Sequence, residues 1–123
     1  MDYLKQGETR DYGVLFLNDE GDLFDPTDPT YEISHYVKNG TITWVQDVSE
    51  SALFRIDLGH YAFTWFVDEN IYEIDETYYI RFRGTDPDTS IRNIEERVAR
   101  IIHPNSGGGG DICQSNIVAR FVF

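Results

Sequence analysis

Hydrophobic and polar residues alternate along much of this chain with a period of two. In residues 59–65 the aromatic side chains of Tyr61, Phe63 and Trp65 occupy every second position, and residues 78–83 repeat the pattern. Successive side chains of a β-strand point to opposite faces of its sheet. Each run therefore predicts a strand that lays an aromatic-rich face on a core.

Further strands are predicted where an alternating or apolar run is bounded by turn residues, at residues 8–18, 31–37, 41–46, 52–57 and 117–123. Asn39-Gly40 supplies the positive φ values of a type I′ turn, so it predicts a hairpin. Residues 91–102 fit a helical stripe and a strand alternation equally well. Seven or eight short strands with frequent turns are typical of an antiparallel β-sandwich, and a barrel is the main alternative.

The apolar positions of these strands define a predicted core. Its members are Val14, Phe16, Phe54, Ile56, Tyr61, Phe63, Trp65, Tyr78, Ile80 and Phe82. A chain of 123 residues can form one such domain, which we expect at residues 1–104. Four consecutive glycines then predict a flexible tether at residues 105–111, followed by a C-terminal strand at residues 112–123.

The C-terminal strand combines a clean alternation with this tether. Ile117, Ala119, Phe121 and Phe123 share one of its faces. Such a strand can pair in its own sheet or add to the edge of a neighbouring subunit's sheet, where backbone hydrogen bonds set the register. The pattern leaves both pairings open, and these four side chains are candidate partner-binding residues.

The net charge narrows the range of partners. The chain carries a formal charge of −12, with 22 acidic and 10 basic residues. Such a surface repels phosphates, so we expect no binding to nucleic acid. Solubility, docking onto a basic partner and adaptation to salt are three explanations of the acidity. We expect no membrane span, no secretory signal in residues 1–8 and, because Cys113 is the single cysteine, no intramolecular disulfide.

Acidic loops offer the main candidates for chemistry. Asp19, Asp22 and Asp25 could supply oxygen ligands to Ca²⁺, although Asp in a turn-rich segment also bonds to its own backbone. The acidic loop at residues 68–76 contains carboxylates without the apolar pocket that would raise the pKa of one of them, as glycoside hydrolysis needs. We therefore expect a solvated loop, no catalytic residues and no cofactor.

The turn and strand motifs follow a definite order. In chain order they are Gly7-Glu8-Thr9, Asp19-Glu20-Gly21, Asp25-Pro26-Thr27, Asn39-Gly40-Thr41, residues 59–65 and residues 78–85. This order resembles the immunoglobulin-like β-sandwich domain of structural proteins in tailed-phage virions. The resemblance covers about residues 4–103, and residues 94–98 resemble the last strand of that domain, which favours a strand over a helix there.

The resemblance implies a virion component without enzymatic activity, such as a capsid decoration, neck or tail-associated protein. Its partners would be other virion proteins and copies of itself, and it would reside in the virion after synthesis in the host cytoplasm. The alternative is a carbohydrate- or receptor-binding module, which needs exposed aromatic rings. Trp44, Tyr72 and Tyr79 are the candidates, because the pattern places them at or near outward positions.

Overall fold

A computed structural model describes residues 1–105 and 117–123 of the chain. All regular secondary structure in this part of the chain is β, which confirms the prediction of an all-β fold. Its strands are β1 (Asp2–Lys5), β2 (Thr9–Leu17), β3 (Thr27–Lys38), β4 (Ile42–Ala52), β5 (Phe54–Asp57), β6 (His60–Phe66), β7 (Thr77–Thr85), β8 (Arg92–Ile102) and β9 (Ile117–Val122). Over the same residues no helix has the length and apolarity needed to cross a membrane.

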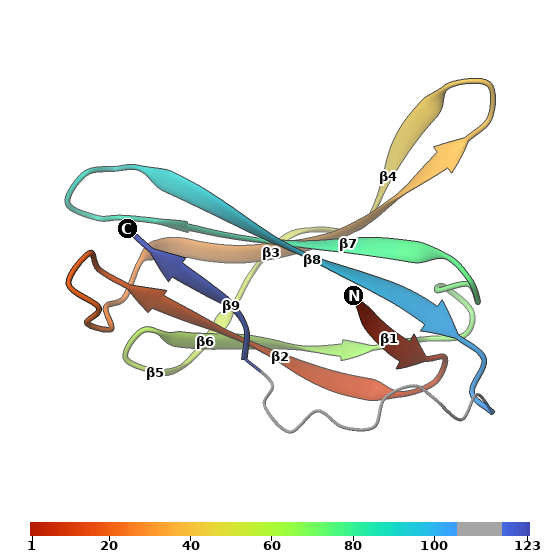
Figure 1. Ribbon diagram of the computed structural model, residues 1–123, viewed down its shortest axis with the longest axis horizontal. Coiled ribbons are helices and arrows are strands. Elements are labelled where there is room, and N and C mark those ends of the chain that lie inside the picture. Colours follow the sequence, from red (N-terminus) through yellow and green to blue (C-terminus); the bar gives the residue numbers. More distant parts are fainter. Residues whose placement is uncertain (106–116) are drawn as a thin grey trace.

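Two sheets pack face to face and form the predicted sandwich (Figure 1). The five-stranded sheet has the order β1-β8-β7-β3-β4, and the four-stranded sheet has the order β5-β6-β2-β9. The prediction of purely antiparallel pairing is wrong at two edges, because β1 pairs with β8 and β9 pairs with β2 in parallel. Parallel neighbours need a long connection, and both pairs join strands that are far apart in the chain.

Aromatic rings fill the core between the sheets. Phe63 stacks on Tyr31 with ring centroids 3.9 Å apart and on Tyr12 with centroids 5.4 Å apart. Such stacked pairs stabilise the fold beyond the area that they bury. Eight of the predicted core residues are confirmed as buried, namely Val14, Phe16, Tyr61, Phe63, Trp65, Tyr78, Ile80 and Phe82.

The core prediction is wrong for Phe54 and Ile56, which are 54% and 50% exposed. Phe54 pairs with Ala62 of β6, and Ala62 lies between two aromatic residues that point into the core. Because cross-strand partners share a face, Phe54 lies on the outer surface of its sheet. Leu53, one residue earlier, is buried instead.

The segment that the pattern left open between helix and strand forms β8. It pairs with β7 from Arg92 to Arg100. Ala99 and Ile101 of β8 are fully buried, while the residues between and beside them point away from the core. A strand forms here rather than a helix because β8 gains a ladder of hydrogen bonds and a buried face at the same time.

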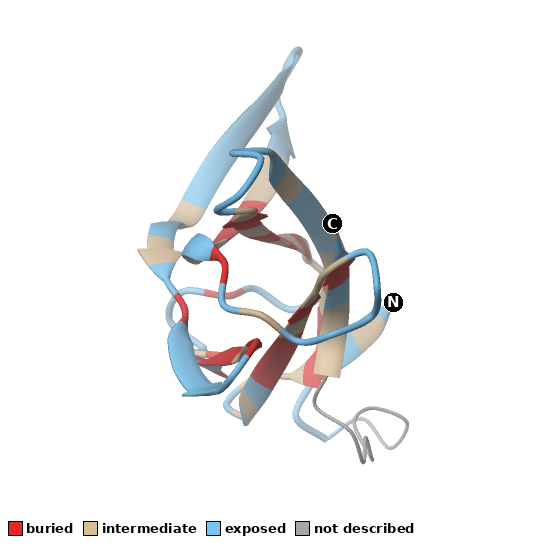
Figure 2. Ribbon diagram, turned by 90° about the vertical axis from the view of Figure 1, so that its left-hand side faces the viewer, coloured by how far each residue is buried: buried red, intermediate tan, exposed pale blue. Residues whose placement is uncertain are grey.

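The hairpin of β3 and β4 extends beyond the sandwich (Figure 1), and most of its surface is exposed (Figure 2). The pairing of β3 with β7 stops at Ser34, whereas its pairing with β4 continues to Lys38. The end of the hairpin is therefore a two-stranded ribbon. The predicted hairpin is confirmed, but Gly40 alone in its turn has a positive φ, so the turn is not of type I′.

Candidate functional site

One face of the five-stranded sheet packs on the core, and the opposite face, here called the outer face, is open to solvent. Ile33, Ile80 and Ala99 point into the core, so their neighbours along β3, β7 and β8 point outward. The register of β3 and β4 places Tyr36 beside Trp44. Side chains from four strands therefore meet on the outer face.

Three rings on the outer face, Tyr36, Trp44 and Tyr79, form an aromatic cluster. The centroid of the Trp44 ring lies 5.4 Å from that of Tyr36 and 5.3 Å from that of Tyr79, both edge-on. The Arg81 guanidinium lies 4.8 Å from the Trp44 centroid, a cation–π contact. Trp44 nevertheless remains 49% exposed. The cluster joins the projecting hairpin to the body of the sheet and leaves an aromatic surface available to a partner.

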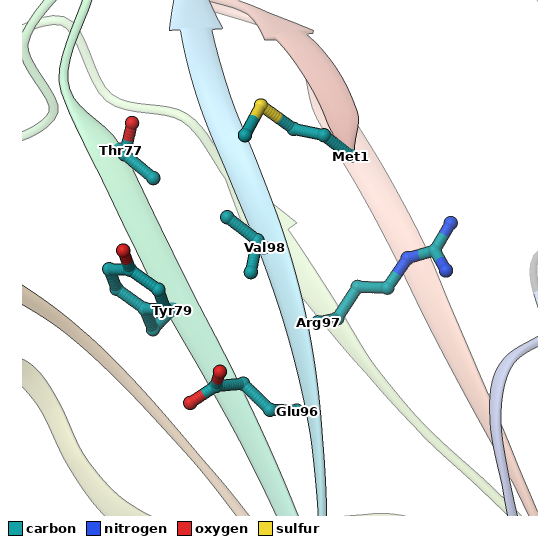
Figure 3. A pocket seen from close by; sticks show the side chains of 6 residues that line it. All are labelled: Met1, Thr77, Tyr79, Glu96, Arg97 and Val98. Carbon is teal, nitrogen blue, oxygen red and sulfur yellow. The ribbon is translucent and has the colours of Figure 1, made fainter.

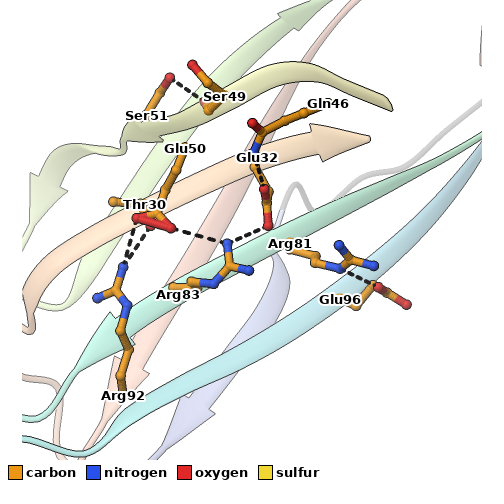
Figure 4. A network of polar contacts seen from close by, with 10 residues as sticks. All are labelled: Thr30, Glu32, Gln46, Ser49, Glu50, Ser51, Arg81, Arg83, Arg92 and Glu96. Carbon is orange, nitrogen blue, oxygen red and sulfur yellow. Dashed lines mark hydrogen bonds and ion pairs between the residues drawn. The ribbon is translucent and has the colours of Figure 1, made fainter. Parts of the chain in front are cut away.

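Charged side chains occupy the rest of the outer face (Figure 4). Arg81 donates to Glu96 over 2.9 Å. Arg83 contacts Glu32 and also Glu50, whose Oε1 lies 3.3 Å from its Nη1. Charge-assisted pairs of this kind hold both side chains in place. The carboxylates of this face are thus held against arginines.

Glu32 is a buried member of this network. Burial by itself would raise its pKa, but hydrogen bonds from Arg83 and Gln46 to the carboxylate outweigh burial, so that the pKa is lowered. Arg92 extends the network, because it donates to Thr30 Oγ1 over 3.0 Å. The ionised form of Glu32 is therefore part of the folded sheet.

The outer face is less acidic than the rest of the molecule. Six of the ten basic residues and three glutamates lie on it: Lys5, Lys38, Arg81, Arg83, Arg92, Arg100, Glu32, Glu50 and Glu96. The net charge of the whole chain is −12, so the acidic excess lies elsewhere. A second acidic molecule is therefore repelled least at this face.

β4 forms one edge of the five-stranded sheet. Residues 42–46 of this edge contain no charge and no proline, although both features commonly protect edge strands from pairing with other chains. Ile42 and Trp44 are 62% and 49% exposed. The structure thus presents an unprotected apolar strand edge.

Two open hollows border the aromatic cluster. One lies over β7, β8 and the start of the chain (Figure 3), and it is lined by Met1, Thr77, Tyr79, Glu96, Arg97 and Val98. Glu96 is paired with Arg81, and Arg97 donates to Asp2 over 2.8 and 3.0 Å. The charged groups of this hollow are engaged in structural pairs.

The other hollow lies at the base of the hairpin beside a histidine–aspartate pair that the sequence analysis missed. His35 Nδ1 lies 2.7 Å from Asp47 Oδ2, and only the strand pairing brings together these residues, which are twelve positions apart. The backbone N–H of Glu73 donates to the Tyr78 hydroxyl, and burial raises the pKa of Tyr78 to about 12. The described lining of the hollow contains no serine, threonine or cysteine that the pair could activate.

The three candidate calcium ligands are not brought together. Asp25 accepts hydrogen bonds from the Gly59 N–H (2.9 Å), from the Arg55 guanidinium and from the Tyr61 hydroxyl. The bond from Gly59, followed by that from Arg55, lowers the pKa of Asp25. Asp19 and Asp22 lie on the exposed turn instead. Within residues 1–105 and 117–123, no group of three or more potential ligands is placed to hold a metal ion.

The aromatic residues named for sugar binding separate into two groups. Trp44 and Tyr79 lie on the outer face, but the prediction is wrong for Tyr72, which is buried with its ring centroid 5.2 Å from that of Trp65. The side chain of Tyr72 thus anchors the acidic loop to the core. Its Asp75 is exposed and lies 3.7 Å from Arg100.

The C-terminal strand pairs within its own chain, where β9 lies beside β2. Phe121 is buried and stacks on Phe16 with centroids 4.7 Å apart, and the Phe123 ring contacts Phe24. Partner binding by Ile117, Ala119, Phe121 and Phe123 stays a prediction. The glycines of the proposed tether and Cys113 lie outside the described residues.

Comparison with known proteins gives no relative from which this surface could be interpreted. No protein-family model matches the chain, and no curated protein or solved structure is significantly similar to it.

Proposed function

We propose that this chain is a non-enzymatic structural protein of a tailed-bacteriophage particle, such as a capsid decoration, neck or tail-associated protein, and that it acts through protein–protein contacts. The observation that carries the proposal is the projecting β3–β4 hairpin. Its exposed Ile42 and Trp44 share one face of the ribbon with Tyr36 and form an apolar surface of the kind that marks an interaction site. The charged side chains beside it are paired with one another across the sheet.

The strand order supports the immunoglobulin-like part of the proposal. In an immunoglobulin sandwich, strands B, E and D lie in one sheet and strands C, F and G in the other, with C′ added in variable domains. If β2 corresponds to strand B, the orders β2-β6-β5 and β4-β3-β7-β8 follow this scheme. β1 and β9 then add one parallel edge strand to each sheet.

An antibody raised against the purified chain tests this function. We expect it to detect the chain in particles purified on a density gradient and to label a single position on them in negative-stain images. Antibody that has been blocked with the purified chain is the control. A chain that is abundant in the lysate but absent from purified particles would refute the proposal.

A carbohydrate- or receptor-binding module is the second candidate. It is favoured by the exposed Trp44, which lies beside Tyr79 and the Arg81–Glu96 pair. Aromatic rings next to polar groups suit a ligand that has both an apolar surface and polar groups. Arg81 already occupies part of the Trp44 ring, which weakens this candidate. A glycan array distinguishes the two: binding that is lost in Trp44→Ala supports a sugar site, whereas no binding to any glycan argues against it.

A further inference from the structure

We propose that two copies of this chain associate through β4, which pairs with the β4 of the second copy in antiparallel orientation about a two-fold axis. The two five-stranded sheets would then join into one continuous sheet. This inference rests on the proposed function, because it names one partner of the projecting hairpin, a second copy of the chain.

The first step of the argument is the choice of edge. Each sheet has two edges, formed by β1 and β4 in one sheet and by β5 and β9 in the other. β1 and β5 have four residues each and β9 has six, whereas β4 has eleven. Residues 42–46 of β4 pair with β3 without a register shift and carry no protective charge or proline, so they offer a regular row of backbone N–H and C=O groups to an added strand.

The second step is the identity of the partner. Copies of a chain with a net charge of −12 repel one another, so they can approach only where the local charge is less negative. β4 borders the outer face, which carries most of the basic residues. Lys38 at the tip of the hairpin adds a positive charge beside this edge.

The third step is the register. If Trp44 lies on the two-fold axis, Ile42 lies opposite Gln46 and Thr43 lies opposite Val45, and all of these residues are uncharged. A register centred on Asp47 would instead place two carboxylates opposite each other, which is destabilising. The favoured register also brings the two Trp44 rings together across the axis, where aromatic cross-strand pairs are stabilising. Such a self-complementary contact closes as a dimer.

Light scattering coupled to size-exclusion chromatography of the full chain tests the pairing. We expect the mass to approach twice the chain's 14.3 kDa as the protein concentration rises. Val45→Glu and Thr43→Lys should each abolish the dimer, since each places an unpaired charge at the pairing edge. Val122→Glu, at an exposed valine of β9, is the matched control and should leave any dimer intact.

The double variant Thr43→Lys/Val45→Glu tests the register. With Trp44 on the axis, each new lysine lies opposite a new glutamate, so the dimer should return. Circular dichroism of every variant shows whether the sandwich is retained, and the Thr43→Lys variant provides a second test if Val45→Glu fails to fold. A wild type that stays monomeric over the whole concentration series, or single variants that still dimerise, would overturn the inference.

This experiment and the antibody experiment can fail separately. A chain found in particles that is monomeric in solution refutes β4 pairing alone. A chain that dimerises through β4 but is absent from particles retains the pairing and refutes the proposed function.

Discussion

Glu32 is a buried carboxylate on a face that is otherwise open to water, and its environment is set by individual neighbours. Arg83 and Gln46 both bond to it, which keeps it ionised in spite of burial. At the same scale, Gly84 permits the close approach of Phe16 in the core: a Cβ at Gly84 would collide with the Phe16 ring. Both residues give predictions that do not depend on the function of the protein.

Replacing Glu32 by Gln should lower the free energy of unfolding at neutral pH by about 1–3 kcal/mol, because Arg83 loses a buried charged partner. The pKa of Glu32 is lowered in the folded state from its usual 4.5. Its stabilising effect is therefore complete above that usual value and is lost as the pH falls through the folded pKa. Urea unfolding across the acid range should show the difference between wild type and variant shrinking on acidification.

Glu96→Gln is the control for this prediction. Glu96 pairs with Arg81 at a more exposed position, where such pairs contribute about 0–1 kcal/mol. The role given to Glu32 would be contradicted if both variants lost the same free energy of unfolding. It would also be contradicted if the difference between wild type and Glu32→Gln did not depend on pH.

Gly84→Ala should lower the free energy of unfolding by about 1–3 kcal/mol, the usual cost of overpacking a filled core. Denaturant unfolding measures it. The cost should fall when Phe16 is first replaced by Leu, since the two positions are in contact and their effects should not add. Strict additivity of the two substitutions would show that the collision with the Phe16 ring is not the cause.

At the scale of strands, the two edges that carry interaction proposals differ in how they are built. β4 is an exposed edge with few contacts to the core, whereas β9 completes the core of the four-stranded sheet through Phe121. The partner-binding role predicted for β9 would expose that part of the core in any copy that donates its strand without receiving one. The role inferred for β4 requires no such exchange.

Phe121→Ala should lower the free energy of unfolding by about 3–5 kcal/mol, the range for deleting a buried phenylalanine ring. Val122→Ala, at the adjacent residue of β9 that is exposed, should change it by less than about 0.5 kcal/mol. Urea unfolding of both variants in the monomeric Val45→Glu background measures these effects. If β9 pairs with its own β2, the loss is independent of protein concentration, and a loss that depends on concentration would indicate a donated strand.

At the scale of the whole molecule, charge is distributed unevenly. A net charge of −12 on 123 residues destabilises a compact chain by self-repulsion, while the exposed ion pairs of the outer face, such as Arg81–Glu96, are individually weak. Screening by salt therefore removes more repulsion than attraction.

Adding a simple salt should consequently raise the melting temperature of the chain. Differential scanning calorimetry of the monomeric Val45→Glu variant over a series of sodium chloride concentrations tests this, and the uncharged osmolyte sucrose serves as a control for effects unrelated to screening. A melting temperature that falls with salt would show that the ion pairs of the outer face outweigh the repulsion.

Much of the fold could be predicted from period-two alternation. Tyr61, Phe63 and Trp65 are buried as expected, because a strand has only two faces and the aromatic one must leave water. Phe54 alternates equally well, yet its side chain is exposed, because Phe54 pairs with Ala62 and shares with it the face of the sheet that points away from the core. Of the aromatic candidates for a site, Trp44 and Tyr79 were placed correctly, but Tyr72 lies in a loop where alternation carries no information.

The sequence by itself determined that this chain is a small β domain with an aromatic core, since side-chain periodicity and turn residues are local properties. The tertiary structure alone decided for a sandwich over a barrel, and it decided the strand order, the parallel edges and the meeting of Tyr36, Trp44, Tyr79 and Arg81 on one face. These features depend on which distant strands lie side by side, and that choice is set by the packing of the two sheets together.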